Sequence, residues 1–173
     1  MNTQIKTAAL DGNEAVIRQM EPALTGIVHD LAESAQHKAG LSVTSLLIKG
    51  GLSGALLGLA TTFCFLAFNG ASGGLASLLA GAVFPVGFAV IALLKLELVT
   101  GNFAVLSLGA LAGKVSLPAL ARNWSWVYFG NFLGSVFVGL LLAVALTHAF
   151  LTPGGFLAEK IVDVANAKTL AYQ

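Results

Sequence analysis

Two charged residues inside a long apolar stretch are the first candidates for chemistry in this chain. Lys95 and Glu97 stand within residues 75–113, a run that is otherwise uncharged. Ionisable groups inside a membrane are costly and usually functional. The alternative is a local ion pair between the two side chains that caps a break in a helix. The residue types alone favour neither interpretation.

Polar and aromatic residues flank this charged pair. Thr100, Gly101 and Asn102 follow it directly and could offer hydroxyl, amide and backbone groups to a solute. Phe84 and Phe88 lie upstream beside a proline, where a helix can kink and a phenylalanine can narrow a path. On spacing alone, these two phenylalanines are more typical of lipid-facing or core positions.

The composition excludes several classes of protein. The chain has 173 residues, of which 57% are apolar and 10% charged, with one cysteine and a net charge of +1. That charge argues against a nucleic-acid partner, and one cysteine excludes a disulfide scaffold or a cysteine-based zinc site. We find no nucleophile–base pair and no set of metal ligands, so we expect no enzyme, metal or cofactor. An integral membrane protein remains.

The apolar runs predict an all-α protein with three membrane spans. The first covers about residues 44–69 and the third about residues 123–149. A single helix over residues 75–113 would extend ~58 Å, nearly twice the hydrocarbon core of ~30 Å. We therefore predict a second span that is broken in mid-membrane, with a non-helical patch over residues 95–102. Such breaks occur where they face protein or a water-filled path.

Glycines predict how these spans pack. Gly50, Gly54 and Gly58 recur every four residues in the first span, and Gly130 and Gly134 do the same in the third. Four-residue spacing places small residues on one face of a helix, where another helix can approach closely. We expect tight helix packing along these faces.

The N-terminal residues 1–43 predict an amphipathic surface helix, lying on the membrane or on the protein. Its apolar stripe is Val16, Met20, Leu24, Ile27 and Leu31. We expect a break near Glu21, with Pro22 in the first turn of the following helix.

The lysines and arginines predict the topology. Three crossings in residues 44–149 leave residues 150–173 on the side opposite the N-terminus. The N-terminal side would hold Lys6, Arg18, Lys38, Lys49, Lys114 and Arg122, and the other side Lys160 and Lys168. This imbalance predicts a cytoplasmic N-terminus and an external C-terminal segment, in the plasma or inner membrane or in an organelle membrane.

Three segments, in the same order, resemble the formate/nitrite transporter family, most closely its nitrite-transporting, algal and fungal-like branch. They are Phe-Pro-Val-Gly-Phe at residues 84–88, Glu-Leu-Val-Thr-Gly-Asn at residues 97–102 and Asn-Trp-Ser-Trp-Val-Tyr-Phe-Gly-Asn at residues 123–131. The resemblance implies an aquaporin-like fold of six spans in two inverted repeats, assembled as a pentamer with one pore per protomer. The chain then corresponds to the first repeat and the approach to a fourth span.

The resemblance also implies roles for single residues. Phe84, Phe88 and Leu98 match narrow apolar points of the family's pore, and Thr100 matches a threonine linked to gating. We place Asn102 beside them on the transport path. The lysines that match the inner and outer vestibules are Lys49 and Lys168. Lys95 departs from the family, in which a small residue, usually glycine, stands at this position.

The function implied by this resemblance is transport of small monovalent anions such as formate or nitrite, together with protons. The family's second broken helix, with its central histidine, has no counterpart among these residues. We therefore expect an N-terminal half that does not conduct alone. The alternative is a non-transporting membrane subunit, or a remnant, that packs with a full-length relative.

Overall fold

The structure is a computed structural model that describes residues 2–69 and 73–171. Within those ranges the chain is helical and holds no strand, which confirms the all-α prediction. The helices, in chain order, are α1 (Asn2–Ala39), α2 (Val43–Ala67), α3 (Gly73–Leu93), α4 (Val99–Leu111), α5 (Leu117–Leu146) and α6 (Gly155–Leu170).

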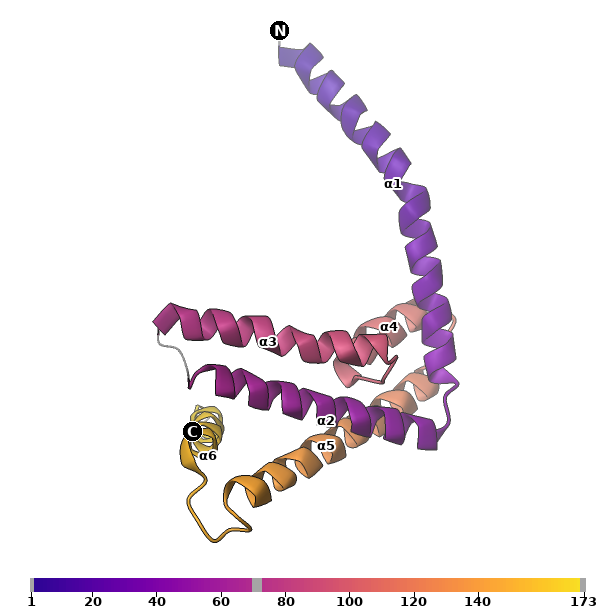
Figure 1. Cartoon of the computed structure of the whole chain (residues 1–173). Helices are drawn as coiled ribbons and strands as arrows, with labels where there is room; N and C mark the ends of the chain where they lie inside the picture. Colours follow the sequence, from indigo (N-terminus) through magenta and orange to yellow (C-terminus); the bar gives the residue numbers. More distant parts are fainter. Residues whose placement is uncertain (1, 70–72, 172–173) are drawn as a thin grey trace.

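Three of these helices, α2, α3 and α5, are long and apolar enough to cross a membrane. They run in alternating directions, and α2 lies between the other two (Figure 1). The three predicted spans are therefore present. The third begins at Leu117, six residues before the predicted start. The reason is local, because Ser116 caps the first turn of α5 through the N–H of Ala119, and proline occupies an early position of that turn.

The predicted break in the second span is present. Helix α3 ends at Leu93, α4 begins at Val99, and residues 94–98 between them, called the break from here on, are not helical. The break is shorter than predicted, because residues 100–102 form the first turn of α4. Ser53 of α2 donates a hydrogen bond to the carbonyl of Glu97 at 2.6 Å. The break thus lies level with a point about 15 Å along α2 from its start, inside the apolar layer.

The end of α3 explains where the break begins. The N–H of Leu96 bonds to the carbonyl of Ile91, and that of Lys95 to the carbonyl of Ala92, both at 3.0 Å. This pair of bonds is a Schellman motif, which ends a helix with a residue in the left-handed conformation. Lys95 is that residue, with φ +51°.

Glycines allow α2 and α5 to approach closely, as the four-residue spacing predicts. A Cβ at Gly54 would overlap the backbone carbonyl of Asn131, and one at Gly134 would overlap the carbonyl of Gly51. A Cβ at Gly50 would lie 3.1 Å from the carbonyl oxygen of Val127. The two backbones are therefore in contact along this face.

The N-terminal helix differs from the prediction. Helix α1 continues through Pro22, so the expected break near Glu21 is wrong, although Figure 1 shows a bend part-way along α1. An interior proline removes one backbone hydrogen bond, and the helix can bend there without ending. Val16 and Met20 lie among residues whose side chains are not described. The rest of the apolar stripe, Leu24, Ile27 and Leu31, is exposed.

The last two turns of α1 pack on the protein. Ala35 is fully buried and forms a cluster with Leu106 of α4 and with Val115 and Leu120. A Cβ at Gly109 would overlap the side chain of Ala35, so a small residue is required where α1 crosses α4. α1 therefore crosses the bundle at the end where α2 and α5 begin (Figure 1).

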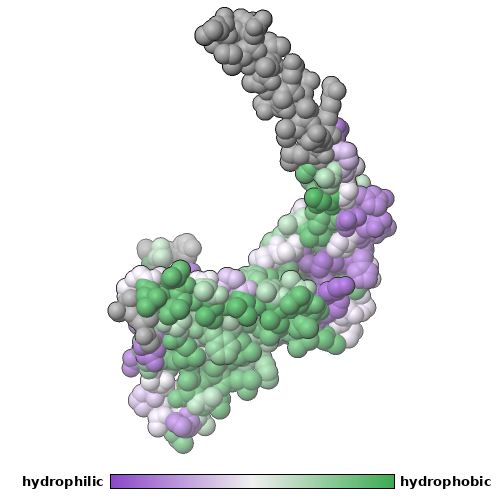
Figure 2. All heavy atoms as spheres, turned by 45° about the horizontal axis from the view of Figure 1, so that its top comes forward, coloured by the Kyte–Doolittle hydropathy of each residue, from purple (hydrophilic) through white to green (hydrophobic). Residues whose placement is uncertain are grey.

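Helix α6 lies at the opposite end, against the end of α2. The ammonium group of Lys160 stands 5.1 Å from the ring centroid of Phe68. Apolar residues dominate the surface over the spanning helices, and hydrophilic residues gather where α1 meets them (Figure 2). This distribution suits a chain whose middle lies in lipid and whose ends lie in water.

Candidate functional site: a helix break between two pockets

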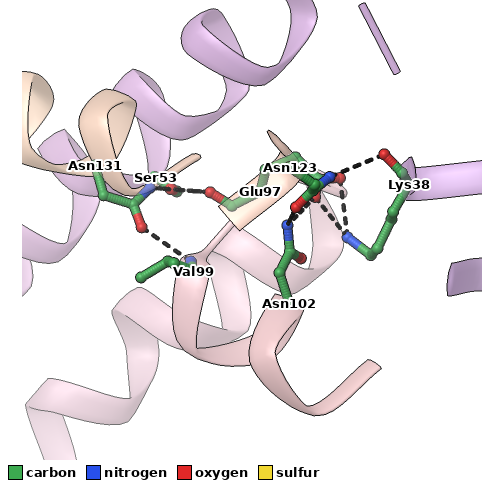
Figure 3. Close-up of polar contacts among 7 residues, drawn as sticks. All are labelled: Lys38, Ser53, Glu97, Val99, Asn102, Asn123 and Asn131. Carbon is green, nitrogen blue, oxygen red and sulfur yellow. Dashed lines mark hydrogen bonds and ion pairs between the residues drawn. The ribbon is translucent and has the colours of Figure 1, made fainter. Parts of the chain in front are cut away.

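Asn131 of α5 binds two of the backbone groups that the break leaves without helical partners. Its Oδ1 accepts a hydrogen bond from the N–H of Val99 at 2.9 Å, which caps the start of α4. Its Nδ2 lies 3.0 Å from the carbonyl oxygen of Glu97 and 2.8 Å from Oγ of Ser53 (Figure 3). Backbone groups that lack partners inside a membrane cost several kcal/mol each, so this side chain makes the break tolerable.

Glu97 forms an ion pair with Lys38 of α1, so the alternative of a local ion pair with Lys95 is not what the structure shows. The ammonium group of Lys38 lies 2.9 Å from both carboxylate oxygens of Glu97. The Glu97 side chain is only 3% exposed. Lys95 is exposed, because its left-handed backbone turns the chain at the end of α3. The intramembrane charge thus has its partner on a helix that lies 59 residues away in sequence.

Amide side chains complete this buried network. Asn102 Nδ2 donates to Glu97 Oε2 and to Asn123 Oδ1, both at 2.8 Å. Asn123 Nδ2 donates in turn to the carbonyl of Lys38 at 2.9 Å (Figure 3). Arg122 donates to the carbonyl of Leu41 at 2.9 Å. α5 therefore holds the end of α1 in the position that brings Lys38 to Glu97.

Residues 95–97 of the break line an open polar pocket of about 770 Å³. Lysines from three elements line it: Lys38 from α1, Lys49 from α2 and Lys95 from the break. Leu96 and Glu97 belong to the same lining. The vestibule lysine expected at Lys49 thus stands beside two further lysines, and its role in attracting anions stays a prediction.

The last residue of the break and the first turn of α4 line a smaller, open apolar pocket of about 280 Å³. Phe88, Leu98 and Thr100 line it together with Phe132 of α5. Phe84 does not line this pocket, but its ring packs edge-on against Phe88 with centroids 5.3 Å apart. The structure thus brings together four of the residues predicted for the transport path.

Two predicted site residues lie elsewhere. Asn102 is 1% exposed and belongs to the network around Glu97, not to the lining of the apolar pocket. Lys168 is exposed in the last turn of α6, at the opposite end of the bundle (Figure 1). Nothing in the geometry joins Lys168 to the break.

The comparison with protein families decides the identity. The family model for the formate/nitrite transporter matches residues 25–172. The chain belongs to the formate/nitrite transporter family.

Individual members of the formate/nitrite transporter family show how far the likeness extends. The formate channel of Bacillus thuringiensis is 35% identical over 140 residues, which cover 79% of this chain and 52% of that protein. The nitrite transporter of Salmonella typhimurium is 30% identical over 120 residues, which cover 68% of this chain and 45% of that one. The chain spans about half the length of the curated relatives it matches.

A solved structure shows the same fold. A formate/nitrite transporter family ion channel superposes with a TM-score of 0.65 and 28% sequence identity. The superposition covers 70% of this chain and 50% of that one. The three spans with a broken second helix are therefore a formate/nitrite transporter fold.

Sequence reasoning missed the partners of the break. Asn123 and Asn131 stand in the segment that carries the family resemblance, but the sequence does not show which backbone groups they bind. A polar amide in the middle of an apolar span was the available signal, because such a group needs a partner in lipid. Lys38 gave no comparable signal, since it lies in a polar segment like any solvated lysine.

Proposed function

We propose that this chain forms one wall of a membrane channel for small monovalent anions, with formate and nitrite as the substrate class. One observation carries the proposal: successive residues from the break into α4 line first a pocket with three lysines and then an apolar pocket. Lys95, Leu96 and Glu97 line the first, and Leu98, Val99 and Thr100 line the second. A solute that passes the break would leave a polar mouth and enter an apolar constriction.

The two pockets favour different forms of a weak acid. Lysines at a mouth raise the local concentration of anions. A dry apolar constriction penalises a bare anion, because the charge loses its hydration there. A weak acid that takes up a proton at the break crosses with a smaller penalty. Formic and nitrous acid both have this chemistry, and the named relatives include a formate channel and a nitrite transporter.

The start of α4 adds a favourable field at the same place. The N–H of Val99 is capped by Asn131, and the helix begins with its positive dipole end at the apolar pocket. Thr100, in the next position, offers a hydroxyl group and lines the pocket. The positive end of the α4 dipole and the Thr100 hydroxyl would attract the oxygen atoms of a solute in the apolar pocket, which none of the three lysines lines.

The apolar pocket is open on one side in this chain. Phe88 is 40% exposed and Phe132 is 54% exposed. In transporters built from inverted repeats, the path lies between the two repeats. We therefore propose that a second repeat covers this wall, within a pentamer of six-span protomers. The same open wall would suit a subunit that packs on a full-length relative without conducting.

Uptake into liposomes tests these proposals. The 173-residue chain is reconstituted alone and together with the second repeat of the Bacillus thuringiensis formate channel, and formate and nitrite influx is recorded. We expect saturable uptake only with the second repeat. Lys168→Ala should then lower uptake mainly at low anion concentration, since its proposed role is attraction at the outer mouth.

The outcome separates the alternatives. Saturable uptake by the chain alone would show that the path does not need a second repeat. Stable assembly with the second repeat but no uptake of either anion would favour the non-transporting subunit.

A further inference from the structure

Two lysines of the polar pocket have no carboxylate partner among the side chains that the structure describes. Glu97 neutralises Lys38 through its two contacts of 2.9 Å. Among the described side chains, from residue 21 onward, no carboxylate lies within 4.0 Å of the ammonium group of Lys49 or Lys95. Both lysines nevertheless line the same pocket of about 770 Å³. Two lysines without a close carboxylate among the described side chains therefore share one open cavity, which Asp30 and Glu33 also line.

Lys95 has a strained backbone conformation, although its side chain is exposed. Its φ of +51° is the left-handed conformation, which glycine normally supplies at the end of a Schellman motif. A residue other than glycine is strained there, because its Cβ comes too close to the following carbonyl oxygen. The Lys95 side chain is exposed, so packing does not offset that strain. Strain retained without a packing gain points to a role for the side chain itself.

Two carboxylates oppose these lysines from exposed positions in the same pocket. Asp30 and Glu33 of α1 also belong to the lining, with His37. Their carboxylates lie 3.8 and 3.7 Å from the ring nitrogens of His29. The side chains of Asp30 and Glu33 are 86% and 65% exposed, so water screens most of their effect on the lysines.

We propose that Lys49 and Lys95 form a binding site for a doubly charged oxyanion, such as sulfate, inorganic phosphate or the phosphomonoester headgroup of phosphatidic acid. Two ammonium groups match two negative charges, and a pocket of about 770 Å³ has room for such an ion with its hydration water. The desolvation penalty rises steeply with charge, so such an ion would not follow a monovalent anion into the apolar pocket. It would remain at the mouth, whether or not the chain conducts.

Calorimetric titration of the purified 173-residue chain in non-ionic detergent tests the site. Sodium sulfate is titrated against sodium nitrate at equal ionic strength. We expect sulfate to bind more tightly, and Lys95→Asn or Lys49→Gln to weaken it roughly tenfold, as expected for one charged hydrogen bond. Lys95→Arg should keep the affinity. Lys114→Gln is the matched control, because Lys114 is exposed and does not line the pocket.

A second readout guards against misfolding. Lys95→Gly relieves the left-handed strain and should raise the midpoint of chemical denaturation while it weakens sulfate binding. Opposite changes in stability and affinity cannot come from a damaged fold.

Titrations in nanodiscs identify the source of the anion. Sulfate affinity that is the same in neutral and in phosphatidic-acid-containing discs supports a free ion. Sulfate binding that phosphatidic acid abolishes in wild-type discs supports a lipid headgroup. Equal sulfate affinities for the wild-type chain, Lys95→Asn and Lys49→Gln in detergent and in discs would overturn the proposal.

Discussion

At the break, single side chains supply hydrogen bonds that the backbone of a continuous helix would supply. Asn131 caps the N–H of Val99 and, with Ser53, occupies the carbonyl of Glu97. The Glu97 carboxylate is in turn neutralised by Lys38. Each of these contacts joins residues that lie far apart in the chain, so the shape of the break depends on tertiary packing.

The Lys38–Glu97 pair gives an asymmetric prediction. Lys38→Ala should lower the free energy of unfolding by roughly 3–5 kcal/mol, because it leaves a buried carboxylate without a partner. Glu97→Gln should be milder, since the Lys38 side chain is 21% exposed and can reach water, whereas that of Glu97 is 3% exposed. Chemical denaturation in detergent measures both, and the double variant gives the coupling. A larger loss for Glu97→Gln than for Lys38→Ala would contradict this account.

The hydrogen bond from the backbone N–H of Val99 to Asn131 can be tested by substitution of Asn131. Asn131→Leu removes the acceptor for the N–H of Val99, and the expected loss is about 2–3 kcal/mol of stability with faster hydrogen exchange at residues 97–100. Ser125→Ala is the control, because Ser125 is exposed and bonds only to the carbonyl of Ala121 in its own helix. Unchanged exchange at the start of α4 would show that Asn131 does not hold the break.

At the scale of helices, the existence of each element is easier to predict from the sequence than the residue at which it ends. The length of the apolar run requires a break, and the glycine spacing requires close packing of α2 and α5. The far end of the break could not be predicted, because the N–H of Val99, where α4 starts, bonds to Asn131 on another helix. The partner of Glu97 was missed for the same reason, since no local pattern links Lys38 to a residue on another helix.

The contact between α2 and α5 gives a prediction for helix packing. Gly54→Ala and Gly134→Ala should each destabilise the chain by roughly 2 kcal/mol or more, because the new methyl group would meet backbone that cannot move aside. Gly139→Ala is the matched control, because a Cβ at Gly139 of α5 would meet nothing within 4 Å. Thermal unfolding in detergent measures the relative stabilities of the three variants. Equal effects at Gly134 and Gly139 would mean that the close approach is not required.

On the scale of the whole molecule, the two ends differ in charge. Lys38, Lys49, Lys95, Lys114 and Arg122 belong to the half of the bundle where α1 lies, whereas Lys160 and Lys168 belong to α6 at the other end. Positive residues concentrate on the cytoplasmic side of membrane proteins. The architecture and this imbalance point to one orientation in the membrane.

Reporter fusions test that orientation. We expect a reporter at the N-terminus to be active only in the cytoplasm and one after residue 173 to be active only outside, because three crossings separate them. Variants in which Lys114 and Arg122 are replaced by glutamine should weaken the preference. Both reporters on the same side would contradict three crossings.

The central claim is that solutes pass the break on the side of Thr100, between the lysine-lined mouth and the apolar pocket. Cysteine labelling in a Cys64→Ser background tests it most directly, in liposomes that hold the chain together with a second repeat. A small methanethiosulfonate reagent should modify Thr100→Cys and block formate uptake, because Thr100 lines the apolar pocket. Asn102→Cys should stay unmodified, since residue 102 is buried behind the break. Modification and block at residue 102 with none at residue 100 would contradict the account.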